Sequence, residues 1–182
     1  MKTAALCLAR LQRPVEKMAG TVPLTTPPVS MGGYDPGYFA GAKLVYFILH
    51  GLGQEEDAGY WYGDNALRVL SASQVAALPL DGALVFCGSC YGGRTSPMVN
   101  ALFQAGALTV VTGTGKNVTN VALSLGTHWR EWLQRGKTAL RAFELARSQT
   151  LLYRFFQAGD IMSYMLLGRQ AVTLSERTPR NG

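Results

Sequence analysis

Two short runs of consecutive apolar residues most constrain the fold of this chain. They lie within residues 42–49, where Lys43 is the one charged residue, and residues 83–87, and leucine, valine and phenylalanine occur in both. A strand without polar alternation is typical of a parallel sheet that is covered on both faces. The stretch between the runs is long enough for the crossover that parallel neighbours require. We therefore expect the two runs to be neighbouring parallel strands.

Other segments alternate between helix and strand patterns. Ser71 or Ser73 is expected to cap a short helix that runs to Ala77 before Pro79. Apolar periodicity and glycine positions predict further elements. The helices are expected at 97–104, 117–135 and 137–156, and the strands at 107–112 and at 164–174, the last of these broken at residues 168–169. This order predicts an α/β sandwich with helices on both faces of the sheet.

The region before residue 42 predicts less regular structure. Residues 3–18 have a helical pattern in which Pro14 is expected to kink or end the helix. Residues 22–41 are rich in proline and glycine and are expected to form a connecting arm. The chain of 182 residues therefore divides into a helix and arm (1–41), an α/β domain (42–175) and a basic tail (176–182).

Composition argues against several classes of protein. Apolar residues make up 48% and charged residues 15%, which indicates a globular chain. The net charge of +6 is spread over predicted helices and the tail without a basic groove motif, so we expect no nucleic-acid partner. The sequence shows no signal peptide and no long uncharged apolar segment, so we expect a cytoplasmic protein without a membrane partner.

The three cysteines do not form a recognisable structural set. Their odd number suggests no disulfide framework, and a second pair for a zinc site is lacking, so we expect no metal. Cys87 and Cys90 have the spacing of a redox pair, but they lie at the end of a strand rather than at the start of a helix. Cys87 is expected to lie in the core.

The two apolar runs end at residues that are capable of nucleophilic chemistry. His50 and Gly51 follow the first run, and Cys90 lies in the glycine-rich turn 88–93 after the second. The carboxyl ends of parallel strands meet at one edge of a sheet, where α/β proteins place their sites. An imidazole there can take the proton of a thiol, and the thiolate can attack an acyl carbon. His50 and Cys90 are therefore the candidate catalytic pair.

From His50 onwards the chain resembles the caspase-like cysteine peptidases, and within them the CHAT domains most of all. The resemblance covers residues 42–174 and rests on the order of several features. These are the strand ending in His50-Gly51, the helix at 70–80, the strand and turn at 83–92, and the segment 105–111. A closing strand at 164–168 is similar to that of the gingipain branch. It implies a caspase-like three-layer sandwich, with a mostly parallel sheet and helices on both faces.

The resemblance also implies a mechanism and partners. His50 would be the general base and acid, Cys90 the nucleophile, and the N–H groups of Gly51 and Cys90 the oxyanion hole. Such a cysteine endopeptidase acts on a protein or peptide and needs no cofactor. These folds usually have one or two strands before the histidine strand, which residues 1–40 are not expected to supply. Either the chain lacks the first strands, or another polypeptide completes the sheet, and a regulatory protein partner is expected as well.

Substrate preference stays open at this point. Gly88 lies two residues before Cys90, where caspases have glutamine and metacaspases aspartate. Gly88 and Ser89 are candidate substrate contacts, together with three acidic residues in the loop after His50, which are Glu55, Glu56 and Asp57. The acidic residues could select a basic substrate side chain, but the interpretation that we favour is a solvated acidic loop.

Two other functions are compatible with the sequence. One is an inert scaffold that retains the caspase-like fold in order to bind a protein partner. The other is a thiol α/β-hydrolase, because residues 88–92 match a nucleophile elbow with cysteine in place of serine. That fold needs an acid and then a histidine after the nucleophile. Here His128 precedes Asp160, and His128 is expected to be structural.

Overall fold

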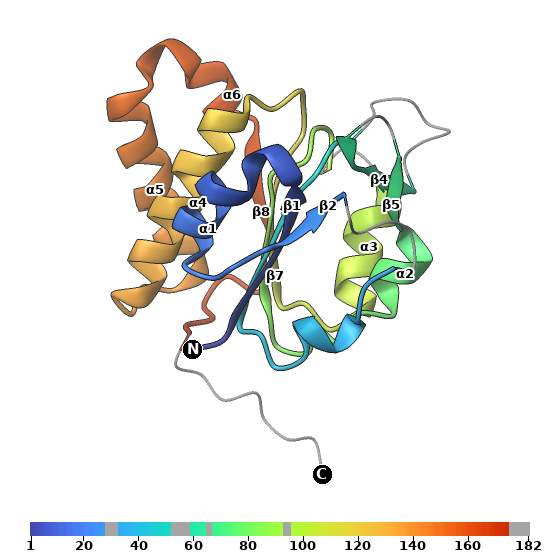
Figure 1. Ribbon diagram of the computed structural model, residues 1–182. Helices are drawn as coiled ribbons and strands as arrows, with labels where there is room; N and C mark the ends of the chain where they lie inside the picture. Colours follow the sequence, from blue (N-terminus) through green and yellow to red (C-terminus); the bar gives the residue numbers. More distant parts are fainter. Residues whose placement is uncertain (28–32, 52–58, 65–66, 93–95, 175–182) are drawn as a thin grey trace.

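The computed structural model describes residues 1–27, 33–51, 59–64, 67–92 and 96–174 (Figure 1). Within them a six-stranded sheet has the order β2-β1-β3-β6-β7-β8. Its strands are β1 (Thr3–Leu8), β2 (Leu24–Thr26), β3 (Leu44–Ile48), β6 (Leu84–Cys87), β7 (Thr109–Gly113) and β8 (Tyr164–Gly168). All neighbours are parallel except β7 and β8. The prediction that the two apolar runs form neighbouring parallel strands is confirmed.

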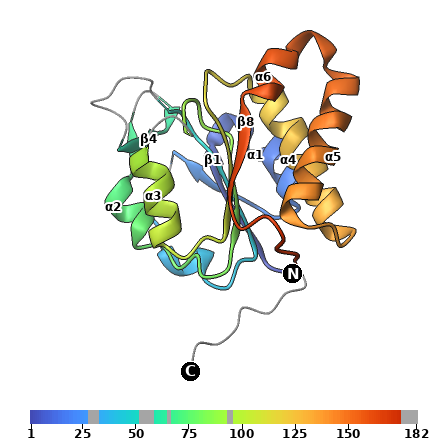
Figure 2. The same ribbon diagram turned by 180° about the vertical axis from the view of Figure 1, so that it is seen from behind.

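Helices cover both faces of this sheet, as Figures 1 and 2 show. One face carries α1 (Gln12–Ala19), α4 (Thr119–Gln134) and α5 (Ala139–Tyr153), and the other carries α2 (Ala72–Ala76) and α3 (Ser96–Gln104). The short α6 (Ala158–Met162) leads into β8, and β4 (Tyr60–Tyr62) pairs with β5 (Arg68–Ser71) as a separate antiparallel ribbon. The predicted three-layer α/β architecture is confirmed.

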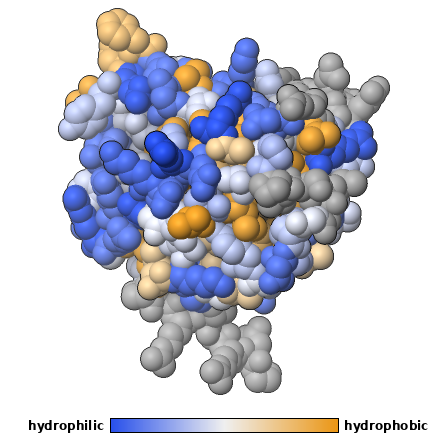
Figure 3. Space-filling view, viewed as in Figure 1, coloured by the Kyte–Doolittle hydropathy of each residue, from blue (hydrophilic) through white to orange (hydrophobic). Residues whose placement is uncertain are grey.

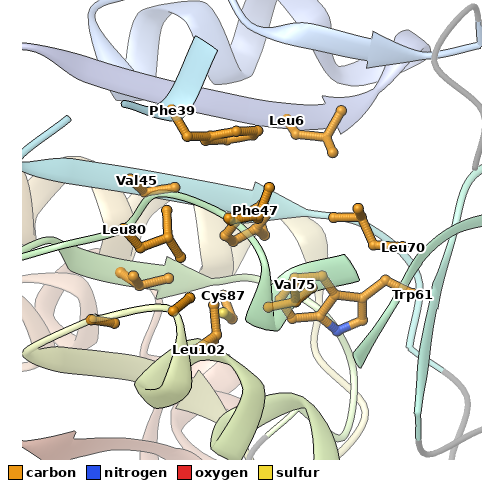
Figure 4. Close-up of a cluster of buried hydrophobic side chains, with 14 of the residues drawn as sticks. Leu6, Phe39, Val45, Phe47, Trp61, Leu70, Val75, Leu80, Cys87 and Leu102 are labelled. Atoms are coloured by element: carbon orange, nitrogen blue, oxygen red, sulfur yellow. The ribbon is translucent and has the colours of Figure 1, made fainter. Parts of the chain in front are cut away.

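The central strands β3 and β6 are apolar throughout because alternate side chains enter two different cores. Val45 and Phe47 of β3 belong to the cluster under α2 and α3, which Figure 4 shows. Tyr46, between them, belongs to the cluster under α1, α4 and α5. Successive side chains of a strand point to opposite faces, so a sheet that is covered twice has no polar side.

The expectation that the chain lacks the first strands is wrong. β1 pairs with β3 over five residues and with β2 on its other side, so the segment before residue 42 completes the sheet itself. Residues 3–8 are therefore a strand rather than the start of a helix, and the boundary drawn at residue 41 has strands of one sheet on both sides. Pro14 lies in the first turn of α1, where its missing N–H has no partner to lose, so the helix continues to Ala19.

Three smaller differences concern the ends and loops. Tyr60–Tyr62 is a strand that the sequence did not predict. The last strand ends at Gly168, and residues 171–174 do not continue it. Of the two expected helix caps, Ser71 is the residue used, because its hydroxyl accepts the N–H of Gln74 at 3.2 Å.

The turn that joins α5 to α6 is the most apolar projection in Figure 3 (upper left). Phe155 and Phe156 are exposed there, beside Leu152, Tyr153 and Met162. None of the described helices combines the length and the apolar character that crossing a membrane requires.

Candidate active site

The ends of β3 and β6 bring His50 and Cys90 to one edge of the sheet. The two strands pair in register from Leu44 with Leu84 to Phe47 with Cys87, so the chain leaves both strands at the same level. Beyond them the backbone of Gly51 lies against that of Cys90. A Cβ on Gly51 would overlap the carbonyl oxygen of Cys90 and lie 3.5 Å from its nitrogen. Only glycine permits so close an approach.

Cys90 is the only one of the three cysteines that reaches the surface. Cys7 and Cys87 are buried in β1 and β6, and Figure 4 shows Cys87 within the apolar cluster. Burial raises the pKa of Cys7 to about 12 and also raises the pKa of Cys87. The expectation that Cys87 is a core residue is confirmed, and Cys90 is the thiol that can meet a reagent or a substrate.

A thiol titration tests this difference in exposure. We expect a disulfide reagent such as Ellman's reagent to modify one thiol rapidly in the folded protein, because a thiolate must form at the surface to react. In denaturant all three cysteines should react. The Cys90→Ala variant should lose the rapid phase while Cys87→Ala keeps it. Rapid loss of two or three thiols from the folded protein would contradict this assignment.

Asn117 positions the sulfur of Cys90. Its backbone N–H donates a hydrogen bond to the Cys90 Sγ at 3.3 Å, and its side-chain amide donates to the carbonyl of Ser89 at 2.9 Å. Gly113 makes room for this side chain, since a Cβ there would overlap the Asn117 amide. An N–H that is aimed at sulfur interacts more strongly with a thiolate than with a thiol.

The turn that carries Cys90 has an unusual backbone. Tyr91 has a φ of 56°, in the left-handed region that non-glycine residues rarely adopt. Its N–H donates to the carbonyl of Gly115 at 2.8 Å, so the turn is held by the segment that follows β7. Within the described residues neither Cys90 nor Gly51 donates its own N–H to another residue. Two backbone donors therefore lie close together at the edge of the sheet.

Buried hydroxyl groups line the interior side of this turn. Ser89, Thr112 and Tyr164 each have a buried oxygen without a hydrogen-bond partner among the described residues. Burial, followed by the nearby Cys90 and Cys87, raises the pKa of Tyr164, so this phenol stays protonated. Ser89 is fully buried, and a Cβ on Gly88 would lie 2.6 Å from the side chain of Ile48. The Ser89 side chain therefore faces the interior in this structure.

His50 is fixed through its backbone. It forms an antiparallel bridge with Tyr62, in which the His50 N–H donates to the Tyr62 carbonyl at 2.8 Å and the Tyr62 N–H donates in return at 2.9 Å. The ribbon of β4 and β5 therefore holds the residue that follows β3. This places the imidazole at the edge of the sheet rather than within its core.

The imidazole of His50 is bonded to an arginine. The Nη2 of Arg10 lies 3.1 Å from the Nε2 of His50, and the Nε of Arg10 lies 3.6 Å from a carboxylate oxygen of Asp64. Arginine has only donors, so Nε2 accepts and the ring proton is on Nδ1. Burial and the charge of Arg10 lower the pKa of His50, and Asp64 opposes this. No hydrogen bond joins the imidazole to the Cys90 sulfur in this arrangement of the described residues.

Sequence analysis did not identify three residues of this site. Arg10 follows β1, whose residues have the sequence pattern of a helix, so its position at the carboxyl edge of the sheet could not be predicted. Asp64 lies just after the unexpected strand β4. Asn117 follows β7, whose carboxyl end lies at the same edge, and this position is the one signal that could have found it. Glu55, Glu56 and Asp57 lie outside the described residues.

His128 is not part of this edge. Its Nδ1 lies 3.0 Å from the hydroxyl of Thr150, so it joins α4 to α5. A thiol α/β-hydrolase would need a histidine after the nucleophile to act on Cys90, and the described contacts of His128 do not place it there. Among the described residues no group of three or more histidine, cysteine, aspartate or glutamate side chains could hold a metal ion.

Comparison with known proteins identifies the fold. No family model and no curated protein sequence matches the chain. The crystal structure of the arginine-specific cysteine proteinase gingipain R matches with a TM-score of 0.63 and 14% identity, over 93% of this chain and 47% of that one. A complex of the pro- and mature domains of RgpB from Porphyromonas gingivalis matches with a TM-score of 0.62 and 12% identity, over 94% of this chain and 48% of that one. A separase–securin complex from Saccharomyces cerevisiae matches with a TM-score of 0.58 and 10% identity, over 91% of this chain and 11% of that one.

The chain thus spans about half the length of the gingipain structures and about a tenth of the separase chain. At these identities the likeness concerns the fold. The predicted caspase-like fold is confirmed, and the closer likeness to CHAT domains stays a prediction.

Proposed function

We propose that this protein is a cysteine peptidase in which His50 is the general base and acid and Cys90 is the nucleophile. The observation that carries the proposal is the backbone contact between Gly51 and Cys90, which unites the ends of β3 and β6. The one partly exposed thiol among the three cysteines lies at that contact, and a histidine follows the neighbouring strand. The caspase-like fold of cysteine proteinases supports the same conclusion.

The reaction begins when His50 takes the proton of the Cys90 thiol. The thiolate attacks the carbonyl carbon of the peptide bond, and the oxygen becomes an oxyanion next to the N–H groups of Gly51 and Cys90. His50 then gives its proton to the leaving amine, which departs and leaves a thioester on Cys90. Water, deprotonated by His50, hydrolyses the thioester and restores the thiol. These steps use no metal and no cofactor.

The backbone donors are central to this mechanism. Donors that are fixed before the reaction stabilise the oxyanion without having to reorganise, and losing one typically costs about 10²–10³-fold in kcat. Gly51 and Cys90 come from different strands, so the sheet itself sets their separation. Of the predicted substrate contacts, Gly88 and Ser89 would contribute through the turn that precedes Cys90. Recognition of a basic side chain by Glu55, Glu56 and Asp57 stays a proposal.

The finer assignments belong to the same proposal. We place the chain with the CHAT type of caspase-like peptidase and expect it to act in the cytoplasm on a protein or peptide. Two of the matched structures are complexes, one with a pro-domain and one with securin. A regulatory protein partner is therefore proposed here too, while β1 and β2 remove the need for one that completes the sheet.

An inert scaffold is the second candidate. The observation in its favour is that His50 and Cys90 are each bonded to another residue, namely Arg10 and Asn117. A protein that retained this arrangement in every complex would bind partners without cleaving them. Labelling of Cys90 distinguishes the two candidates, because a scaffold gains nothing from an activated thiol.

A peptide probe with an acyloxymethyl ketone group provides the test. It alkylates a cysteine only where a bound peptide places the ketone next to an activated thiolate. We expect labelling of the wild-type protein and of Cys87→Ala, and none of Cys90→Ala or His50→Ala. The site of labelling is read by mass spectrometry of the digested protein. Labelling that does not change in either dyad variant would exclude the proposed pair.

A further inference from the structure

Arg10 occupies a place that the proposed mechanism does not explain. It lies in the single-turn helix η1 (Ala9–Leu11) directly after β1, at the same edge of the sheet as His50. Its guanidinium donates through Nη2 to the His50 Nε2 at 3.1 Å and faces Asp64 through Nε at 3.6 Å. A cation therefore sits directly on the proposed general base.

This contact blocks the proposed proton transfer. A base needs a ring nitrogen with a free lone pair, but Nε2 accepts from Arg10 and Nδ1 carries the ring proton. The guanidinium is always charged, so an imidazolium formed beside it would be repelled. The sulfur of Cys90 is correspondingly bonded to the Asn117 backbone. Each of the two proposed catalytic groups is thus bonded to another residue rather than to the other.

We infer that Arg10 holds His50 inactive until an acidic side chain of the peptide substrate binds the guanidinium. The inference rests on the proposed function and adds an acidic residue to the substrate it takes, at a position separate from any basic residue that Glu55, Glu56 and Asp57 would recognise. When the guanidinium turns to the carboxylate, the Nε2 lone pair is freed and takes the proton of the Cys90 thiol. The products of this step are an imidazolium and a thiolate, so charge and atoms balance without another reactant.

The different exposures of Arg10 and Asp64 favour binding of an acidic substrate side chain at this ion pair. The side chain of Arg10 is 60% exposed, whereas that of Asp64 is 23% exposed. The Arg10 side chain is thus accessible to a substrate carboxylate, which arginine can bind through two parallel hydrogen bonds. Asp64 can keep its place beside Nε during this exchange. The net charge of +6 also attracts acidic peptides.

The state of the His50 ring tests the inference without any need for activity. Among the residues that the structure describes, the charged groups that act on His50 are Arg10 and Asp64, and the Cys90 backbone lies against Gly51, the residue after His50. In Arg10→Ala, nitrogen NMR should show a higher pKa of His50, because the charge of Arg10 lowers it, and the Nδ1-protonated form should lose its dominance. Arg13→Ala removes one exposed cation from the neighbouring helix and should change neither. Equal His50 titrations in wild type and Arg10→Ala would overturn the inference.

The reactivity of Cys90 gives a second measurement. At neutral pH, iodoacetamide should alkylate Cys90 about tenfold faster in Arg10→Ala than in wild type, in the usual range for coupling between two sites. The same substitution made in the His50→Ala background should have no effect, because the coupling passes through the imidazole. An equal increase in both backgrounds would show that Arg10 merely covers Cys90, and would overturn the inference.

The substrate class is tested with paired peptides. Each pair carries Glu or Gln at one position within two residues of the cleaved bond. Wild type should cleave the best Glu peptide about tenfold faster than its Gln partner, and Arg10→Ala should lose that preference while Arg13→Ala keeps it. Equal cleavage of both peptides by wild type would overturn the acidic preference and leave the peptidase proposal intact. Absence of cleavage together with absence of probe labelling would instead remove the peptidase proposal and, with it, the assigned substrate class.

Discussion

Replacement of Cys90 or His50 by alanine is expected to lower kcat/KM for a cleaved peptide by roughly 10³-fold or more, since nucleophile and base act as one unit. For the same reason the double variant should be no slower than the slower single variant. Steady-state kinetics on one fluorogenic peptide measures both effects. Thermal unfolding should show little change for Cys90→Ala, because that side chain is only partly buried.

Two control substitutions make the result specific. Cys87→Ala removes a buried thiol three residues before Cys90 and should leave kcat/KM unchanged. His128→Gln alters the histidine that joins α4 to α5 and should also leave kcat/KM unchanged. Turnover that survives in Cys90→Ala, or effects of the two single substitutions that multiply in the double variant, would contradict a His50–Cys90 unit. A wild-type protein that is folded, inert and bound to a partner would favour the scaffold.

Gly51→Ala is expected to damage the site even though it adds a single methyl group. The new Cβ would overlap the Cys90 carbonyl oxygen, which belongs to the backbone and cannot rotate away. The ends of β3 and β6 must therefore separate, at a cost of about 1–3 kcal/mol in unfolding free energy, as for other overpacked sites. The same movement displaces one of the two oxyanion donors, so kcat should fall by about 10²–10³-fold. Denaturant unfolding and kinetics measure the two losses separately.

Gly59→Ala is the matched control for this substitution. Nothing lies within 4 Å of the Cβ position at Gly59, and its backbone does not need a positive φ. The variant should therefore keep both the stability and the activity of the wild type. Activity in Gly51→Ala close to that of Gly59→Ala would show that the contact between Gly51 and Cys90 is not needed for the reaction.

The central strands could be predicted because their own residues reveal how they are buried. Val45, Tyr46 and Phe47 are apolar in sequence because both faces of β3 are covered, and the same holds for Val85 and Phe86 of β6. The turns after these strands contain glycines, and at Gly51 the close approach of the Cys90 backbone requires one. Local signals of this kind suffice to place His50 and Cys90 at the same edge of a parallel sheet.

β1 could not be predicted in this way. Its residues Ala4, Ala5 and Leu6 are good helix formers, and a helical pattern can be followed from them into the real helix α1. The segment is a strand because β2 and β3 satisfy its backbone hydrogen bonds and two cores accept its small side chains. Such pairing depends on residues more than fifteen positions away, so tertiary context overrides local propensity.

The amino-acid sequence by itself determined which groups are available for chemistry, because a histidine and a cysteine that follow apolar strands can be recognised from the order of residues alone. Only the tertiary structure decided what surrounds them. Arg10 reaches His50 from 40 residues away, and Asn117 reaches the sulfur of Cys90 from 27 residues away. These contacts arise where β1, β3, β6 and β7 end side by side, and the spatial order of strands in a sheet is a property of the packed molecule rather than of any local segment.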